Sequence, residues 1–147
     1  MIEYVLMHPD HVSQIAALEA MCFSAPWSER SVESELANPL SLWIVAIDED
    51  TVVGYVGSQS VLGEADMMNL AVLPKYRRQG IGRGLVHELI CQLRCNAVKS
   101  LTLEVRASNE GAIALYQELG FHQVGRRPNY YTNPKEDALI LRKEWEV

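Results

Sequence analysis

The sequence predicts an α/β fold in which one mixed sheet of about seven strands packs with about four helices. Three observations predict it. Apolar strand-like runs recur along the chain, helical apolar stripes separate them, and glycine, proline or asparagine marks most of the boundaries. Because strands and helices follow one another in mixed order, without repeats or linkers, we expect residues 1–147 to form a single domain.

The first half of the chain is expected to supply four strands and two helices. Pro9 opens the first helix, and Ser28 caps a second helix that ends before Asn38-Pro39. The first helix presents one apolar face, made by Val12, Ile15, Ala16 and Leu18. The strands are expected over residues 2–7, 41–47, 51–61 and 64–73, with a hairpin turn at 48–50.

The second half is expected to supply two more helices and three strands. The helix after Gly80 carries an apolar stripe of period 3.6, made by Leu85, Val86, Leu89, Ile90 and Leu93. A short helix starts at Ser108-Asn109 and ends at Gly120. Strands are expected over 99–106, 121–125 and 137–145, with a loop over 126–133. In the first of these, Leu101, Leu103 and Val105 face one side, whereas Thr102 and Glu104 face the other.

Residues 77–83, which we call the anion cradle, follow a strand and lead into a helix. Gly80 and Gly82 allow a ligand close to the backbone, and the first N–H groups of the helix have no internal partner. Lys75, Arg77, Arg78 and Arg83 add positive charge, so a phosphate group suits this segment. No Lys-Ser or Lys-Thr pair follows the glycines and their spacing is G-x-G-x-G, so the segment is neither a Walker P-loop nor a dinucleotide fingerprint.

The pattern Arg77-x-x-Gly80-x-Gly82 resembles the segment with which N-acetyltransferases of the GNAT superfamily hold the pyrophosphate of acetyl-CoA. Five further stretches, in order along the whole chain, resemble the RimI-type enzymes of this superfamily: 23–28, 103–109, 112–121, 127–131 and 136–138. RimI-type enzymes acetylate the N-terminal alanine of a small-subunit ribosomal protein. Two departures lie near the expected peptide site, an extra Ala25 and a short segment at 132–135, and both bear on peptide preference.

The resemblance implies that acetyl-CoA is the co-substrate and that it binds along the fourth strand and the anion cradle. The backbone of Leu70, Ala71 and Val72 would follow the acetyl and pantetheine arm and stabilise the thioester oxygen. The implied pyrophosphate contacts are Arg77, Arg78, Gln79, Gly80, Ile81, Gly82 and Arg83. Asn109 would either contact CoA or serve only as a helix N-cap.

Two residues are the candidate catalytic groups. An α-amine has a pKa of about 8, so a modest carboxylate base suffices to deprotonate it, and by resemblance Glu104 is that base. By the same resemblance, Tyr116 protonates the departing CoA sulfur. The alternatives are an exposed or ion-paired Glu104 and a Tyr116 that packs in the core. Trp27, Tyr130 and Tyr131 either line the peptide groove or pack locally.

Composition narrows the class of protein. The formal net charge of −6 argues against general nucleic-acid binding, and no apolar run is long enough to span a membrane. Three cysteines and the lack of a signal peptide favour a cytoplasmic location. We expect no metal: Cys91 and Cys95 are read as packing residues, and the four histidines are dispersed.

We therefore expect an enzyme that transfers acetyl directly from acetyl-CoA to a ribosomal-protein N-terminus in a ternary complex. A cysteine relay is disfavoured because the cysteines are expected to lie away from the anion cradle. Two alternatives stay open: an acetyltransferase for a lysine, a polyamine or another small amine, and a CoA-binding regulatory module without catalysis. The oligomeric state does not follow from the sequence.

Overall fold

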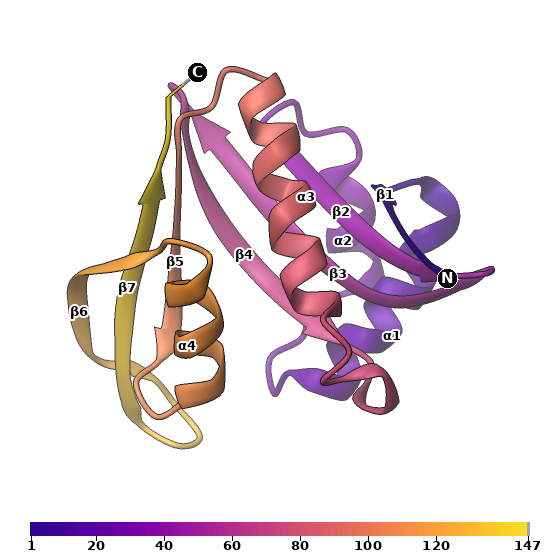
Figure 1. The fold of residues 1–147 in the computed structure, drawn as a ribbon. Helices are drawn as coiled ribbons and strands as arrows, with labels where there is room; N and C mark the ends of the chain where they lie inside the picture. Colours follow the sequence, from indigo (N-terminus) through magenta and orange to yellow (C-terminus); the bar gives the residue numbers. More distant parts are fainter. Residues whose placement is uncertain (147) are drawn as a thin grey trace.

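A seven-stranded mixed sheet forms the centre of the structure, a computed structural model that describes residues 1–146 (Figure 1). Val147, the last residue of the expected domain, lies outside the described residues. The strand order is β1-β2-β3-β4-β5-β7-β6, and β4 and β5 pair in parallel while all other neighbours are antiparallel. The strands are β1 (Ile2–Leu6), β2 (Ser41–Asp48), β3 (Thr51–Val61), β4 (Glu64–Val72), β5 (Ser100–Arg106), β6 (His122–Tyr131) and β7 (Glu136–Glu144).

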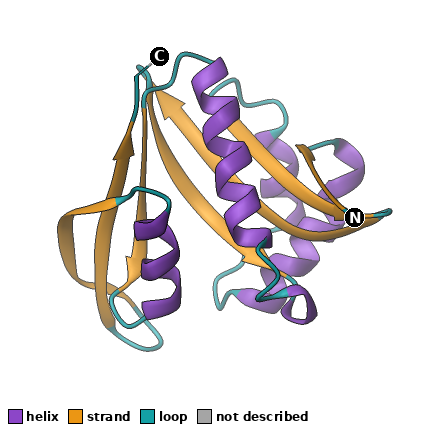
Figure 2. Ribbon diagram, in the orientation of Figure 1, coloured by secondary structure: helices purple, strands orange, loops and turns teal. Residues whose placement is uncertain are grey.

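Four α-helices cover the two faces of this sheet (Figure 2). They are α1 (Val12–Cys22), α2 (Glu29–Glu35), α3 (Ile81–Cys95) and α4 (Glu110–Glu118), and short 3-10 turns precede α1 at Pro9–His11 and α3 at Pro74–Tyr76. Helices α1 and α2 pack on one face, while α3 and α4 pack on the other. The predicted α/β class, the seven strands and the four helices are thus confirmed.

Strands β2 and β3 hold the two layers together because they are apolar on both faces. Ile44 and Val56 pack toward α3, whereas Trp43 and Tyr55 pack toward α1 and α2. The predicted stripe of α3 is buried throughout. Ser28 accepts a hydrogen bond from the N–H of Ser31, so it caps α2 as predicted.

One stretch predicted to be a loop belongs to a strand. Residues 126–131 continue β6 to Tyr131 as an edge strand, so the prediction of a loop from residue 126 was wrong. The register shifts between Arg127 and Tyr131, where three residues of β6 stand opposite Asp137 alone. Pro128 cannot donate a ladder hydrogen bond, and an edge strand with a bulge tolerates it.

Strands β4 and β5 diverge, and this divergence opens the sheet. They pair only from Glu64 opposite Ser100 to Asp66 opposite Thr102, and Figure 1 shows them apart at their far ends. Strand β4 also contains a bulge, because Met68 and Asn69 stand opposite the single residue Gly57 of β3. The bulge redirects the β4 side chains at the point where the two strands separate.

Gly57 is required by close packing at this bulge. A Cβ at this position would lie 2.5 Å from Cε2 of Trp43, which is itself buried against the sheet. We expect Gly57→Ala to lower the free energy of unfolding by about 1–3 kcal/mol in urea denaturation, since the indole must shift. Gly111→Ala is the matched control: nothing lies within 4 Å of the added Cβ, so the helical propensity of alanine is expected to raise stability. Equal stability of the two variants would contradict this prediction.

Candidate active site

The anion cradle has the backbone geometry that phosphate binding requires. Gly80 is the N-cap of α3 with a φ of 80°, a left-handed conformation that favours glycine. No side chain caps α3, so its first N–H groups are free to donate to a ligand at the positive end of the helix dipole. A Cβ at Gly80 would meet nothing within 4 Å, so open space adjoins these groups.

A groove of about 540 Å³ runs over the cradle and along the end of β4. The residues predicted to bind acetyl-CoA that line it are Leu70, Ala71, Val72, Arg77, Arg78, Gly80, Ile81, Gly82 and Arg83. Two predicted contacts lie elsewhere. The Gln79 amide donates to the Lys75 carbonyl at 3.3 Å, and Asn109 accepts from the N–H of Ala112 at 3.2 Å as the N-cap of α4.

A second pocket of about 690 Å³, which we call the acceptor pocket, lies between the diverging ends of β4 and β5. Glu104, Tyr116, Tyr130 and Tyr131 line it together with Asn69 and Asn109. The acceptor pocket and the groove share four lining residues, namely Cys22, Phe23, Leu70 and Ala112. A thioester that follows β4 past Leu70 would therefore reach the point where the two spaces join.

Glu104 lines the acceptor pocket from β5, and its neighbours Leu103 and Val105 are buried on the other face of this strand. The Glu104 side chain is 31% exposed, and Oε1 lies 3.7 Å from Nε of Arg127. The neighbouring Glu104 carboxylate, together with burial, raises the pKa of Tyr130. Burial, with the nearby charges of Glu104 and Glu64, also raises the pKa of Asp66. The carboxylate of Glu104 is thus accessible from the pocket and surrounded by polar groups.

Tyr116 approaches the same pocket from α4. Its ring packs edge-to-face on Phe121 at 5.5 Å, and its hydroxyl lies 3.7 Å from Sδ of Met67. Burial, followed by the influence of Tyr131, raises the pKa of Tyr116 to about 12. The phenol therefore keeps its proton at neutral pH. Tyr116 both packs in the core and lines the acceptor pocket, so the two interpretations of this residue are compatible.

The β6–β7 hairpin places the two neighbouring tyrosines. The Arg106 guanidinium lies 4.4 Å from the centre of the Tyr131 ring and pairs with Glu136 at 3.1 Å. Trp27 does not line either space; it packs against Trp43 with the ring centres 5.5 Å apart. Of the three aromatic residues proposed for the peptide groove, the structure brings together Tyr130 and Tyr131.

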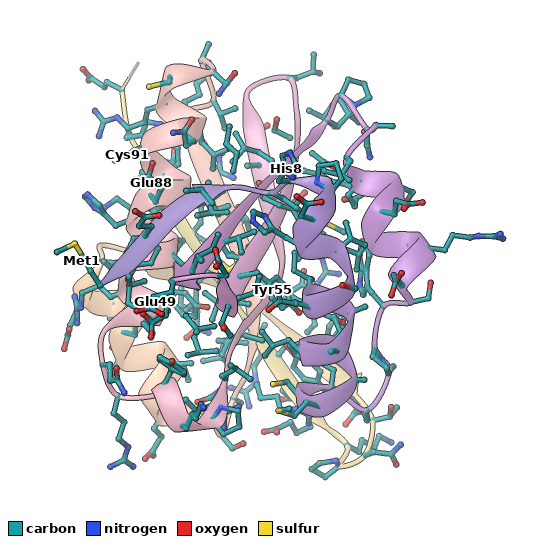
Figure 3. All side chains as sticks on the ribbon, turned by 90° about the vertical axis from the view of Figure 1, so that its right-hand side faces the viewer. Met1, His8, Glu49, Tyr55, Glu88 and Cys91 are labelled. Carbon is teal, nitrogen blue, oxygen red and sulfur yellow. The ribbon has the colours of Figure 1, made fainter. Side chains whose placement is uncertain are left out.

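The cysteines differ from the prediction. Cys22, at the end of α1, lines both spaces, and its Sγ lies 3.7 Å from Nη2 of Arg77, so the expectation that all cysteines lie away from the cradle was wrong. Helix α1 packs across β3 and β4 and thereby carries its last residue to Leu70. Cys91 and Cys95 are exposed on α3 instead of packed, and Figure 3 shows Cys91 on the outer side of that helix.

Sequence reasoning also missed Glu19 and Asn69 as residues of the site. Glu19 stands one position after Leu18 in an apolar helix face, which is the signal that could have marked it as buried. Within residues 1–146, no group of three His, Cys, Asp or Glu side chains is arranged to hold a metal, and no helix is both long and apolar enough to cross a membrane.

The N-terminus of α3 can bind phosphate, and the bulged strand β4 leads from it to a pocket that holds a carboxylate and a phenol. This geometry suits the transfer of a group from a phosphate-bearing donor to an acceptor in the pocket. Residues 12–121 match the model of the acetyltransferase (GNAT) family, and the chain belongs to this family.

The chain is 41% identical over 126 residues to the [ribosomal protein bS18]-alanine N-acetyltransferase of Escherichia coli K12, with 84% of each chain covered. It is 35% identical over 127 residues to the enzyme of that description from Haemophilus influenzae, covering 84% of this chain and 86% of the relative. Its structure matches the crystal structure of the ribosomal-protein-S18-alanine N-acetyltransferase from Escherichia coli with a TM-score of 0.91 and 36% identity, over 100% of this chain and 96% of the other. The chain is thus an acetyl-CoA-dependent N-acetyltransferase.

Proposed function

We propose that this protein acetylates the α-amine of the N-terminal alanine of ribosomal protein bS18. The observation that carries the proposal is the position of Glu104 and Tyr116 on one acceptor pocket, which meets the acetyl-CoA groove at Leu70. The relatives named for this substrate support it. We further propose that residues 1–147 act as one acetyltransferase domain in the cytoplasm. Ribosomal proteins are found there, and its reducing conditions keep the three cysteines as free thiols.

In the proposed reaction the anion cradle holds the co-substrate, which supplies an activated acetyl thioester. Arg77, Arg78 and the first N–H groups of α3 bind the pyrophosphate, and the bulged end of β4 aligns the thioester with the acceptor pocket.

Glu104 removes a proton from the peptide α-amine, directly or through a water molecule. The amine nitrogen then forms a bond to the acetyl carbon while the carbon–sulfur bond breaks. Tyr116 donates its phenolic proton to the departing sulfur. The phenolate then regains a proton from the new amide nitrogen, which still carries the second proton of the attacking amine, so the products are the acetylated peptide and CoA thiol. Because the amine reaches the acetyl carbon itself, transfer is direct and Cys22 carries no acetyl group.

The test is intact mass measurement on two short peptides incubated with enzyme and acetyl-CoA. One peptide begins with a free alanine, and the other has a blocked α-amine and one lysine. We expect one added acetyl group on the first peptide alone. Acetylation of the lysine peptide would contradict the proposed substrate class, and an acetyl group on the enzyme itself after mixing with acetyl-CoA alone would contradict direct transfer.

A further inference from the structure

A buried carboxylate that the proposed chemistry does not use lies beneath the acceptor pocket. Glu19, on α1, is 0% exposed. Its oxygens accept hydrogen bonds from the backbone N–H of Trp27 at 2.9 Å, from the Tyr55 hydroxyl and from the Asn69 amide. Figure 3 shows Tyr55 between the sheet and α1. A buried carboxylate without hydrogen-bond donors is costly, so the three donors are expected to keep their positions around Glu19.

Asn69 links this carboxylate to the acceptor pocket. It belongs to the β4 bulge and lines the pocket directly before Leu70. Its Nδ2 lies 3.1 and 2.9 Å from the two oxygens of Glu19. The neighbours of Glu19 all donate to its oxygens, so the Asn69 amide presents its nitrogen to Glu19 and its oxygen faces away. Among residues 1–146, no donor is found for that Asn69 oxygen.

Glu19 also fixes the opposite wall of the pocket. The segment between α1 and α2 contributes Phe23, Ser24 and Ala25 to the lining. At the end of this segment, the backbone N–H of Trp27 donates a hydrogen bond to Glu19. One carboxylate therefore holds the β4 bulge and the α1–α2 segment in a fixed relation. Tyr55, which is fully buried on β3, donates a hydrogen bond from its hydroxyl to the same carboxylate.

We propose that Glu19 is a positioning residue for acetyl transfer, which orients the Asn69 amide so that its oxygen accepts a hydrogen bond from an N–H of the acceptor amine. The inference rests on the proposed function, because it concerns the same acceptor. Asn69 adjoins Leu70, where the groove meets the pocket, so this hydrogen bond would hold the amine next to the thioester while Glu104 receives its proton.

The test compares steady-state kinetics of Glu19→Gln, Asn69→Ala and the double variant with the free-alanine peptide. A glutamine at position 19 carries an NH₂ group, so the Asn69 amide is no longer forced to keep its oxygen toward the pocket. We expect each single variant to lower kcat/KM for the peptide about fivefold to tenfold, with the KM for acetyl-CoA unchanged. The double variant should be no slower than Asn69→Ala, because Glu19 acts through Asn69.

Glu35→Gln is the matched control, since Glu35 is the other buried glutamate on this face. It accepts hydrogen bonds from Asn38, Ser41, Trp43 and Gln59, none of which lines either space. We expect it to lower the melting temperature and leave kcat/KM unchanged. The inference is overturned if Glu19→Gln behaves like this control, or if the losses of the two single variants multiply in the double variant.

The same experiment separates this inference from the proposed function. If the wild-type protein acetylates the lysine peptide and not the free-alanine peptide, the proposed substrate is wrong. The variant series is then measured with the lysine peptide. The role of Glu19 is supported if both single variants lower kcat/KM and the double variant is no slower than Asn69→Ala, and it is overturned otherwise.

Discussion

Glu104→Gln is expected to lower kcat for the free-alanine peptide by at least about a hundredfold, because the variant removes the base that accepts the amine proton. The dissociation constant for CoA, measured by calorimetry, should stay unchanged, since Glu104 lines only the acceptor pocket. The fold should also persist, because the side chain is 31% exposed and its ion pair with Arg127 is long, at 3.7 Å.

Glu64→Gln is the control for this change. Glu64 is an exposed carboxylate at the start of β4, pairs with Arg142 at 2.9 Å and lines neither space. Its replacement should leave kcat within about twofold of the wild-type value. Full turnover by Glu104→Gln would remove Glu104 as the base and favour its alternative interpretation as a surface ion-pair partner.

Tyr116→Phe is expected to slow turnover by about a hundredfold without unfolding the protein. The ring and its contact with Phe121 are kept, and within residues 1–146 the hydroxyl meets only Met67 Sδ at 3.7 Å. Its loss should therefore change the free energy of unfolding by less than about 1 kcal/mol. Tyr4→Phe, which removes a phenol on β1 that lines neither space, is the control and should keep full activity. Wild-type turnover by Tyr116→Phe would leave Tyr116 with core packing alone.

The same residue predicts the pH dependence of the wild-type enzyme. With a pKa of about 12, Tyr116 remains protonated below that value and able to donate throughout the range from neutral to about pH 10. The peptide amine loses its proton near pH 8, so kcat/KM should rise to a plateau at about that pH. No decrease is expected before about pH 10. A decrease that begins near pH 9 and disappears in Tyr116→Phe would show that Tyr116 loses its proton there, which would contradict its raised pKa.

The parts of the site that follow local rules were predictable from the sequence. Alternation along β5 put Glu104 on the other face from Leu103 and Val105, and Gly80 and Gly82 at the start of α3 marked the anion cradle. Both features depend on a few neighbouring residues, so pattern and spacing suffice to identify them.

The remaining features depend on contacts between distant segments. Glu19 and Asn69 are 50 positions apart in sequence, and Cys22 reaches Arg77 only after α1 has packed across the sheet. Residues 126–131 looked like a loop because Pro128 breaks the strand pattern, whereas pairing with β7 supports an edge strand there. Such tertiary contacts leave no periodic signal in the sequence.

The brief parallel pairing of β4 with β5 divides the enzyme into two parts that can vary separately. The groove residues on β4 and in the anion cradle precede β5 in the sequence, whereas Glu104, Tyr130 and Tyr131 lie on β5 and on the β6–β7 hairpin that follows it. Changes in the β6–β7 hairpin therefore reshape the wall that meets the acceptor while the nucleotide-binding part keeps its packing. An enzyme built in this way can alter one wall of its acceptor pocket through changes in a single hairpin, while the binding of its acyl donor is preserved.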